Sequence, residues 1–215
     1  MPGQRGALLS RREDGQDLHH LVWRLGPGVR VCSSAVLGGG IGPRAWILNA
    51  QVPGGYPRLD PERHLAEIAA AEGLMGPGAG LMTAADVTAH TVAADEGVTA
   101  TVTCGLGVRG WAAAPAEATA GAPLPGTVNI VVTVPAALSD AALVNAVATA
   151  TEAKVQALLD AGLDCSGTPT DAVCVAAPDP GPDGGEPFAG PRSPWGSRIA
   201  RAVHAAVLAS ARTAP

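Results

Sequence analysis

The strongest constraint on the fold is a strand, a long helix and a second strand that follow one another in the second half of the sequence. Thr127–Val134 is rich in β-branched residues and is closed by Pro135, which is typical of a strand. Ser139 is a good N-cap for a helix whose apolar pattern runs to about Gly162. Asp171–Ala177 is again strand-like. This succession predicts a sheet that is covered by a long helix.

The other segments add strands that pair with close neighbours in the sequence. A Gly-Pro-Gly turn predicts a hairpin over residues 22–31, and Asp95-Glu96-Gly97 predicts another between 87–94 and 98–104. The remaining expected elements are a strand at 45–52, a helix from Asp60 to Gly73 and a terminal helix at 199–208. Hairpin-like neighbours favour a mixed or antiparallel sheet over a doubly wound parallel one. We therefore expect an α+β fold, a single-domain layered sandwich with flanking helices.

Length and composition fit one compact domain. The chain has 215 residues, of which 47% are hydrophobic but only 3% aromatic, so Ala, Val and Leu must fill the core. Residues 1–20 are polar and are expected to form a flexible N-terminus. That leaves residues 21–215 as the single domain.

Charge and hydropathy argue against several classes of protein. The net charge is −5 and no basic stripe occurs, so no nucleic-acid partner is expected. Apolar runs are short and broken by Gly or Pro, which predicts no membrane span, no secretory signal and a cytoplasmic location. The spacings of the four cysteines and five histidines match no zinc motif, so no metal cofactor is expected. A homo-oligomer is compatible with the sequence.

Three loops in the first half could either form turns or contact a ligand. Gly39 and Gly40 belong to a Gly-rich segment that permits close backbone approach, although neither a phosphate-binding loop nor a dinucleotide fingerprint surrounds them. Asn49 and Gln51 place two amides at a strand end, where they could cap a loop or recognise another amide. Thr83 lies in a small-residue segment and could cap a turn or touch a ligand.

The loop before the last strand is the least ordinary segment of the sequence. Ser166, Thr168 and Thr170 stand beside Asp171, so a short loop holds three hydroxyls and one carboxylate. Such a loop could present an acid and several donors to a substrate, or it could be a turn capped by its own side chains.

Two further positions have both a catalytic and an ordinary interpretation. Thr127 follows Gly126 at the head of the clearest strand, where it could be a nucleophile or simply a strand residue. On the long helix, Asn145 and Glu152 share a polar stripe that could point into a site or into solvent.

Seven segments occur in an order that resembles a known family. They are Gly38–Gly42, Asn49–Val52, Gly80–Ala85, Gly126–Ile130, Asn145–Lys154, Ser166–Ala172 and Gly196–Val203. Together they resemble the adenosylcobinamide amidohydrolase family over residues 30–210. The resemblance implies hydrolysis of the amide that joins the corrin's propionate arm to aminopropanol, which gives adenosylcobyric acid during corrinoid salvage. Cobalt then enters only as part of the corrinoid substrate, and we expect hydrolysis without added metal.

The resemblance also assigns roles to individual residues. Asn49, Gln51, Thr83, Asn145, Ser166, Thr168, Gly39 and Gly40 become candidate contacts to the corrinoid, whose edge carries carboxamides. The broad apolar faces of the ligand favour Trp46 or Trp195 in the pocket, with core packing as the alternative for Trp46. Amide hydrolysis needs a base, for which Asp171 is preferred and Glu152 is the second candidate.

Two other functions remain open at this level. One is a corrinoid-binding module without catalysis, although the chain lacks the Asp-x-His-x-x-Gly motif that would supply an axial histidine. The other is an acyl-transfer enzyme that uses Thr127. The Gly126-Thr127 strand start also resembles the autoprocessed αββα hydrolases, in which such a residue becomes the N-terminal nucleophile. On the sequence alone we expect an intact chain in which Thr127 at most hydrogen-bonds the scissile amide.

Overall fold

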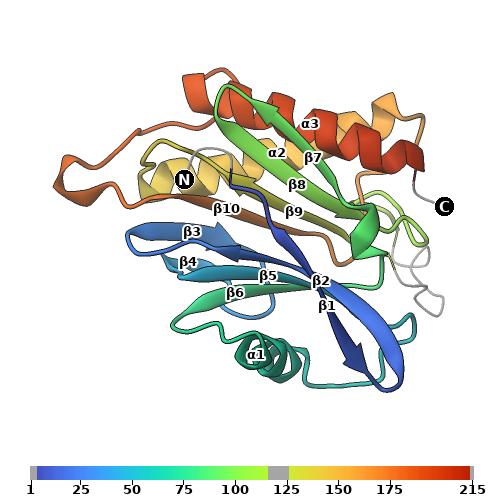
Figure 1. Cartoon of the computed structure of the whole chain (residues 1–215). Helices are drawn as coiled ribbons and strands as arrows, with labels where there is room; N and C mark the ends of the chain where they lie inside the picture. Colours follow the sequence, from blue (N-terminus) through green and yellow to red (C-terminus); the bar gives the residue numbers. More distant parts are fainter. Residues whose placement is uncertain (1–3, 116–125, 214–215) are drawn as a thin grey trace.

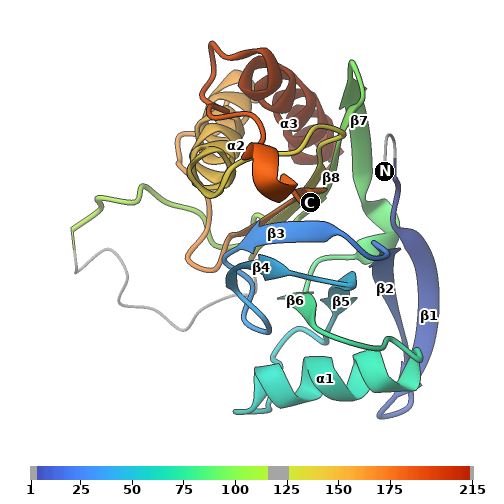
Figure 2. The same ribbon diagram turned by 90° about the vertical axis from the view of Figure 1, so that its left-hand side faces the viewer.

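The protein has four layers. The computed structural model describes residues 4–115 and 126–213. Helices α2 (Asp140–Asp160) and α3 (Pro194–Thr213) cover a six-stranded sheet, which packs on a four-stranded sheet, which is covered in turn by α1 (Pro61–Ala71). Figure 1 shows these layers stacked from top to bottom, and Figure 2 shows the same stacking after a quarter turn.

Both sheets mix parallel and antiparallel pairs. The four-stranded sheet has the order β1-β2-β5-β6 and the six-stranded sheet the order β4-β3-β10-β9-β8-β7. The strands are β1 Ala7–Glu13, β2 Gln16–Arg24, β3 Val29–Ser33, β4 Gly40–Pro43, β5 Trp46–Gln51, β6 Gly78–Thr83, β7 Thr91–Asp95, β8 Val98–Cys104, β9 Val128–Thr133 and β10 Ala172–Pro178. The parallel pairs are β5–β6 and β9–β10, because α1 and α2 provide the crossover connections that parallel neighbours require. Short 3-10 turns lie at Val87–Ala89 and Gly181–Asp183.

The alternation of side chains along the strands divides the interior into three cores. On β9, Val128, Ile130 and Val132 face the helices, whereas Val131 faces the second sheet. Ala79 and Leu81 of β6 meet that inter-sheet core from the other side, and Leu48 of β5 packs toward α1. The inter-sheet core holds the two sheets together.

The expected α+β layered class is correct, but the prediction of one sheet is wrong. The Gly26-Pro27-Gly28 turn does not close a hairpin; it carries the chain from β2 in one sheet to β3 in the other. Gly26 and Gly28 both have positive φ, which lets the backbone change direction over so few residues. Two stacked sheets are difficult to distinguish from one in a sequence, because a turn between sheets uses the same residues as a hairpin turn.

The N-terminal stretch also differs from the expectation of a flexible segment at residues 1–20. Residues 7–20 contain β1 and the start of β2, which form an antiparallel hairpin around Asp14 and Gly15. The hairpin is ordered because Leu18 and Leu21 are buried, and because β2 continues into pairing with β5. β1 is an edge strand rich in charge, which conceals its strand character in the sequence.

The predicted helices are confirmed with shifted ends. Ser139 caps α2 by accepting a hydrogen bond from the backbone N–H of Ala142, as expected of an N-cap. The buried face of α2 consists mostly of alanines, and Leu159, near the C-terminal end of the helix, is 46% exposed. α3 is longer at both ends than its predicted range of 199–208.

Candidate active site

One end of the sandwich collects most of the polar side chains that the two sheets bury. The C-terminal ends of β5, β6 and β8 meet the N-terminal ends of β9 and β10 there. Thr127, immediately before β9, is buried and lies on the face of its strand that is directed at the other sheet. Thr103 of β8 and Asn49 of β5 are buried beside one another between the sheets.

A network of amides joins the two sheets at this end. Asn49 donates from Nδ2 to Thr103 Oγ1 at 2.9 Å, and Asn129 of β9 donates to Asn49 Oδ1 at 2.8 Å. Asn129 also donates to the backbone carbonyl of Met82 at 3.0 Å, next to Thr83 at the end of β6. Within the described residues, the Asn129 Oδ1 atom has no partner although the residue is only 1% exposed. The network fixes the spacing of the sheets where the site opens.

A buried ion pair lies behind the network, on the helix side of the six-stranded sheet. Lys154 of α2 is ion-paired with Asp171 Oδ2, and the two side chains are 8% and 11% exposed. Asp171 Oδ2 also accepts from the backbone N–H of Thr168 at 3.1 Å, and Oδ1 accepts from the N–H of Val128 at 2.8 Å. The Thr168 hydroxyl lies 2.5 Å from Oδ1. Asp171 therefore ties the start of β9 to the loop that precedes β10.

Three threonine hydroxyls surround the peptide bond between Gly126 and Thr127. The Gly126 carbonyl oxygen lies 2.9 Å from Thr168 Oγ1 and 3.1 Å from Thr170 Oγ1, both of which can donate to it. Thr127 Oγ1 is 2.5 Å from Thr170 Oγ1. Thr127 and Thr170 are neighbours because β9 and β10 are parallel and in register at Asn129 and Ala172. The sequence-predicted candidates Thr127, Thr168 and Asp171 are thus brought together.

Two further predicted residues lie at the same end of the sandwich. Gln51 ends β5 on the inter-sheet face, and its Oε1 is buried without a partner among the described residues. Thr83 is 2% exposed, and its hydroxyl accepts a hydrogen bond from the N–H of Ala85, so it caps a turn as the ordinary interpretation predicted. The turn lies beside the site, because Ala85 is close to Gly105, which in turn is close to the Thr127 backbone.

The remaining predicted residues lie elsewhere or hold loops. Asn145 Oδ1 accepts from the N–H of Ala189 at 3.3 Å, and Ser166 contacts the backbone at Gly110 and Ala112. Glu152 is exposed on α2 and two residues from Lys154, which places it on a different side of the helix. Gly39 and Gly40 lie at the β3–β4 turn at the edge of their sheet, where a Cβ at Gly39 would come within 2.6 Å of a backbone oxygen.

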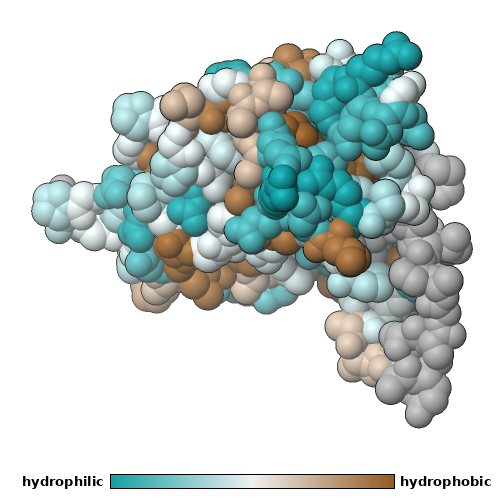
Figure 3. Space-filling view, turned by 90° about the horizontal axis from the view of Figure 1, so that it is seen from below, coloured by the Kyte–Doolittle hydropathy of each residue, from teal (hydrophilic) through white to brown (hydrophobic). Residues whose placement is uncertain are grey.

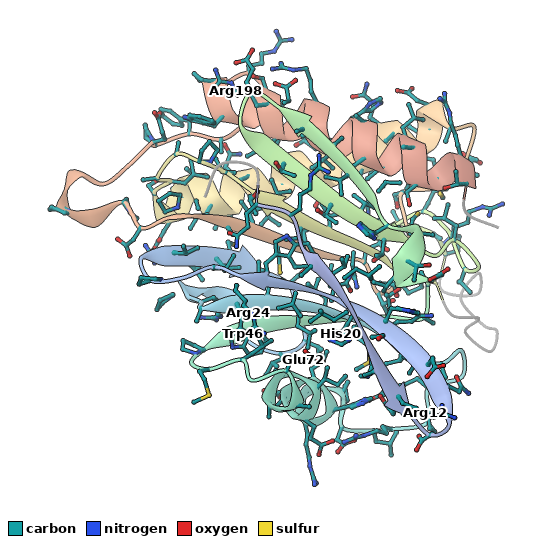
Figure 4. All side chains as sticks on the ribbon, in the orientation of Figure 1. Arg12, His20, Arg24, Trp46, Glu72 and Arg198 are labelled. Carbon is teal, nitrogen blue, oxygen red and sulfur yellow. The ribbon has the colours of Figure 1, made fainter. Side chains whose placement is uncertain are left out.

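The two predicted tryptophans lie away from Thr127, Trp46 at the first residue of β5 and Trp195 in the first turn of α3. Trp46 begins β5, is 6% exposed, donates to the carbonyl of Gly76 at 3.1 Å and borders a groove of about 520 Å³ beside α1. The guanidinium carbon of Arg198 lies over the Trp195 ring, 4.5 Å from the ring centroid. Arg198 also pairs with Glu96 in the β7–β8 turn. Figure 4 shows Trp46 near the four-stranded sheet and Arg198 on the far helix layer.

The groove beside Trp46 is a poorer candidate for chemistry than the threonine cluster. Its lining is mostly aliphatic, with Arg44 and Glu62 as the charged residues. Figure 3 shows the α1 side, where hydrophilic residues gather over the helix. The charges there are engaged with one another, because Arg58 pairs with Asp60 and with Glu67. No hydroxyl or thiol nucleophile lines this groove in the described part of the chain.

The sequence analysis did not select three residues of the site, which are Lys154, Asn129 and Thr103. Lys154 is the only lysine of the chain and sits among the alanines of the apolar face of α2. A lone charge on an apolar face must have a buried partner, and this signal could have identified it. Asn129 and Thr103 gave no comparable signal, because polar residues on a half-buried strand are common.

Cys104 lies close to the cluster but is not suited to act as a nucleophile. Burial, followed by the nearby Asp171 carboxylate, raises the pKa of the Cys104 thiol to about 12. The reactive form of cysteine is the thiolate, which is scarce at neutral pH when the pKa is raised this far. Among residues 4–115 and 126–213, no three His, Cys, Asp or Glu side chains gather in a way that could hold a metal ion.

Comparison with known proteins places the chain in a family. A family model described as adenosylcobinamide amidohydrolase matches residues 6–214, nearly the whole chain. The chain belongs to the adenosylcobinamide amidohydrolase family. An adenosylcobinamide amidohydrolase from Methanosarcina mazei is 36% identical over 177 residues, which cover 79% of this chain and 84% of that protein. Another from Halobacterium salinarum is 48% identical over 86 residues, 40% of this chain and 36% of that protein.

Membership in the adenosylcobinamide amidohydrolase family confirms the resemblance seen in the sequence. The protein is a hydrolase that cleaves aminopropanol from adenosylcobinamide in corrinoid salvage. A non-catalytic corrinoid-binding module is therefore not the function. None of the described helices is long and apolar enough to span a membrane.

Proposed function

We propose that adenosylcobinamide is hydrolysed at the threonine cluster between the two sheets, with the Thr127 hydroxyl as the nucleophile. The observation that supports this assignment is the 2.5 Å contact between Thr127 Oγ1 and Thr170 Oγ1 at this end of the sandwich. Thr127 is the hydroxyl that stands at the head of a central strand, where a rigid element holds it. Cys104, the neighbouring thiol, is deactivated by its raised pKa.

Asp171 acts in this proposal as a positioning residue and not as the base. Both of its oxygens are engaged, by Lys154, by the Val128 N–H and by Thr168. Thr127 Oγ1 contacts Thr170 and not Asp171, so the carboxylate is not placed to take the Thr127 proton. Its contacts instead clamp Thr127 against Thr170, while Lys154 balances the buried negative charge. Glu152, the second predicted base, is exposed and has no part in the proposed chemistry.

The reaction proceeds through an ester. Thr127 Oγ bonds to the carbonyl carbon of the substrate amide, and the bond from that carbon to the aminopropanol nitrogen breaks. The amine leaves with the proton that the hydroxyl gives up. Water then attacks the ester, which releases adenosylcobyric acid as the carboxylate and restores the Thr127 hydroxyl. Covalent catalysis of this kind divides one difficult displacement into two easier ones.

Gln51 is the side chain best placed to recognise the corrinoid's own amides. It ends β5 at the same end of the sandwich as Thr127, and its buried Oε1 has no partner among the described residues. Asn49, which the sequence analysis grouped with it, is 2% exposed and committed to Thr103 and Asn129. We assign Gln51 to substrate contact and Asn49 to holding the sheets together.

Two substitutions of Thr127 test the assignment. Turnover is measured by mass spectrometry as the formation of cobyric acid and aminopropanol from adenosylcobinamide. Thr127→Ser keeps a hydroxyl and should retain turnover within about tenfold, whereas Thr127→Ala should lose at least about 100-fold, because a catalytic nucleophile has been removed.

The matched control is Thr133→Ala, on the same strand and the same face but at its other end. Thr133 is buried, so this variant reports the cost of losing an inter-sheet threonine without touching the site. It should keep the turnover of the unmodified protein. If Thr127→Ala were as active as Thr133→Ala, Thr127 would not be the nucleophile.

A further inference from the structure

We infer that the chain cuts its own peptide bond between Gly126 and Thr127, and that the freed α-amino group of Thr127 then serves as the base for substrate hydrolysis. The inference rests on the proposed role of Thr127 as nucleophile and extends it to how that nucleophile is activated. It departs from the intact chain that the sequence alone favoured. The contacts of the Gly126 carbonyl are what change the expectation.

The first observation is that no base lies beside Thr127 among residues 4–115 and 126–213. Within the described residues, its hydroxyl contacts only the Thr170 hydroxyl. The Asp171 carboxylate is engaged by four donors, and Lys154 is engaged by Asp171. A threonine hydroxyl is a weak nucleophile until a group takes its proton. A free α-amino group on Thr127 itself would be such a group, and cleavage of the preceding peptide bond would supply it.

The second observation is the direction of the hydrogen bonds around the scissile bond. A hydroxyl has one proton, and that of Thr170 is donated to the Gly126 carbonyl oxygen at 3.1 Å. Either hydroxyl could donate in the 2.5 Å contact between Thr127 and Thr170, and in the arrangement that we infer Thr127 is the donor. The protons run from Thr127 to Thr170 to the Gly126 oxygen. This relay removes the proton from the attacking oxygen and delivers it to the oxygen that becomes negative.

The third observation is how the Gly126 carbonyl is held. Its oxygen is approached by two side-chain hydroxyls, those of Thr168 and Thr170. The Thr168 proton is shared with Asp171 Oδ1 and can turn toward the Gly126 oxygen as that atom gains charge. Donors placed around a developing oxyanion are the usual means of stabilising attack on a carbonyl.

Glycine is also the residue that this position demands. A Cβ at Gly126 would lie 2.9 Å from the backbone N of Val108 and 3.2 Å from the carbonyl of Gly105. A side chain there would shift the backbone and move the carbonyl away from the two threonines. The missing side chain also leaves the carbonyl carbon open to attack by the adjacent hydroxyl.

The step balances without any co-reactant except water. Thr127 Oγ bonds to the Gly126 carbonyl carbon, and the relay carries the hydroxyl proton to the carbonyl oxygen. As the carbonyl reforms, the bond from that carbon to the Thr127 nitrogen breaks and the proton passes from the oxygen to the nitrogen. The resulting ester is hydrolysed by one water molecule. The products are a chain that ends at the Gly126 carboxylate and a chain that begins with the Thr127 amine. An α-amino group has a pKa of about 7.7–8.0, which leaves a useful fraction neutral near physiological pH.

Intact-mass spectrometry and N-terminal sequencing of the purified full chain test the inference. We expect two fragments, residues 1–126 and 127–215, with Thr127 as a new N-terminus. Thr127→Ser should still cleave, and Thr127→Ala should stay whole. Thr170→Val preserves shape but removes the relay at an exposed position, so it should remain folded and cleave at least tenfold more slowly. Hydroxylamine should accelerate the break and leave a hydroxamate on Gly126, since it attacks an ester.

The outcomes separate the inference from the proposed nucleophile. An unmodified protein that turns over substrate as a single intact chain would overturn self-cleavage, while loss of turnover in Thr127→Ala would still uphold the nucleophile. Cleavage that persists in Thr127→Ala would assign the break to a foreign protease and would also overturn the inference. A Thr127→Ala chain that stays whole and remains active would show that Thr127 is not the nucleophile and that turnover does not need the cleavage.

Discussion

Lys154 and Asp171 form an ion pair across the boundary between α2 and the start of β10, with both side chains about nine-tenths buried. Burying two charges costs several kcal/mol each unless their attraction and their hydrogen bonds compensate. Asp171 obtains that compensation from Lys154, from Thr168 and from the Val128 N–H, all of which belong to the frame around Thr127. The pair therefore couples the stability of the helix layer to the geometry of the candidate site.

Asp171→Asn should lower both stability and turnover. The amide cannot neutralise Lys154, and removing one partner of a buried pair costs about 3–5 kcal/mol. We expect urea unfolding to shift accordingly and turnover to fall more than tenfold, about 1.4 kcal/mol of barrier. Glu152→Gln makes the same change on the exposed side of α2 and should alter neither quantity.

The double variant Asp171→Asn with Lys154→Met separates the two effects. It removes the unpaired charge, so part of the lost stability should return. Turnover should remain low because the clamp on Thr127 is still missing. A double variant that regained normal turnover would show that Asp171 matters only for folding.

Substitution by leucine should lower stability at Asn49 but raise KM at Gln51. Asn49→Leu removes the hydrogen bonds to Thr103 and Asn129, leaves buried polar groups unpaired and should cost about 2 kcal/mol in urea unfolding. Gln51→Leu removes an amide that has no partner among the described residues, so it should raise KM with little loss of stability. Equal KM values for the two variants would argue against Gln51 as a substrate contact.

The order of elements could be predicted from the sequence, whereas the site could be predicted only in part. The β9–α2–β10 succession and the Ser139 cap depend on local patterns, and both are confirmed. The division into two sheets was missed because glycines with positive φ, such as Gly26 and Gly28, occur both in hairpin turns and in turns that lead from one sheet to another. Thr127 and Asp171 stood out locally. Lys154 did not, because its role depends on a partner 17 residues away.

The cysteines should be inert in the folded protein. Burial raises the pKa of Cys174 and, together with Asp171, that of Cys104 to about 12. Burial also raises the pKa of Cys32, and Cys165 is buried. Iodoacetamide near neutral pH should therefore neither label these thiols nor reduce turnover, while all four should react in urea. Inactivation that follows the labelling of Cys104 would place a thiol in the mechanism and would contradict Thr127 as the nucleophile.

His20 should make the protein less stable as the pH falls below 6.5. It is fully buried on β2, and its Nε2 lies 3.0 Å from Glu72 Oε1 in a geometry that completes no hydrogen bond. Figure 4 shows the two side chains between β2 and α1. Burial lowers the pKa of His20, and the nearby Glu72 carboxylate opposes this effect without overcoming it. The folded protein therefore resists taking up the proton.

The sign of the effect follows from proton uptake in the two states. Above pH 6.5 the imidazole is neutral in both states and contributes no pH dependence. As the pH falls from 6.5 toward the lowered pKa of the folded state, the unfolded chain binds a proton that the folded chain does not, so the free energy of unfolding decreases. Between pH 7.5 and 5.5 the loss can reach about 1.4 kcal/mol.

Asp60, whose pKa is lowered to about 2 chiefly by its hydrogen bond with Arg58, titrates outside this window. Urea unfolding across this range should show a flatter pH dependence in His20→Gln than in the unmodified protein. Identical slopes in the two proteins would mean that His20 does not set the acid limit of stability.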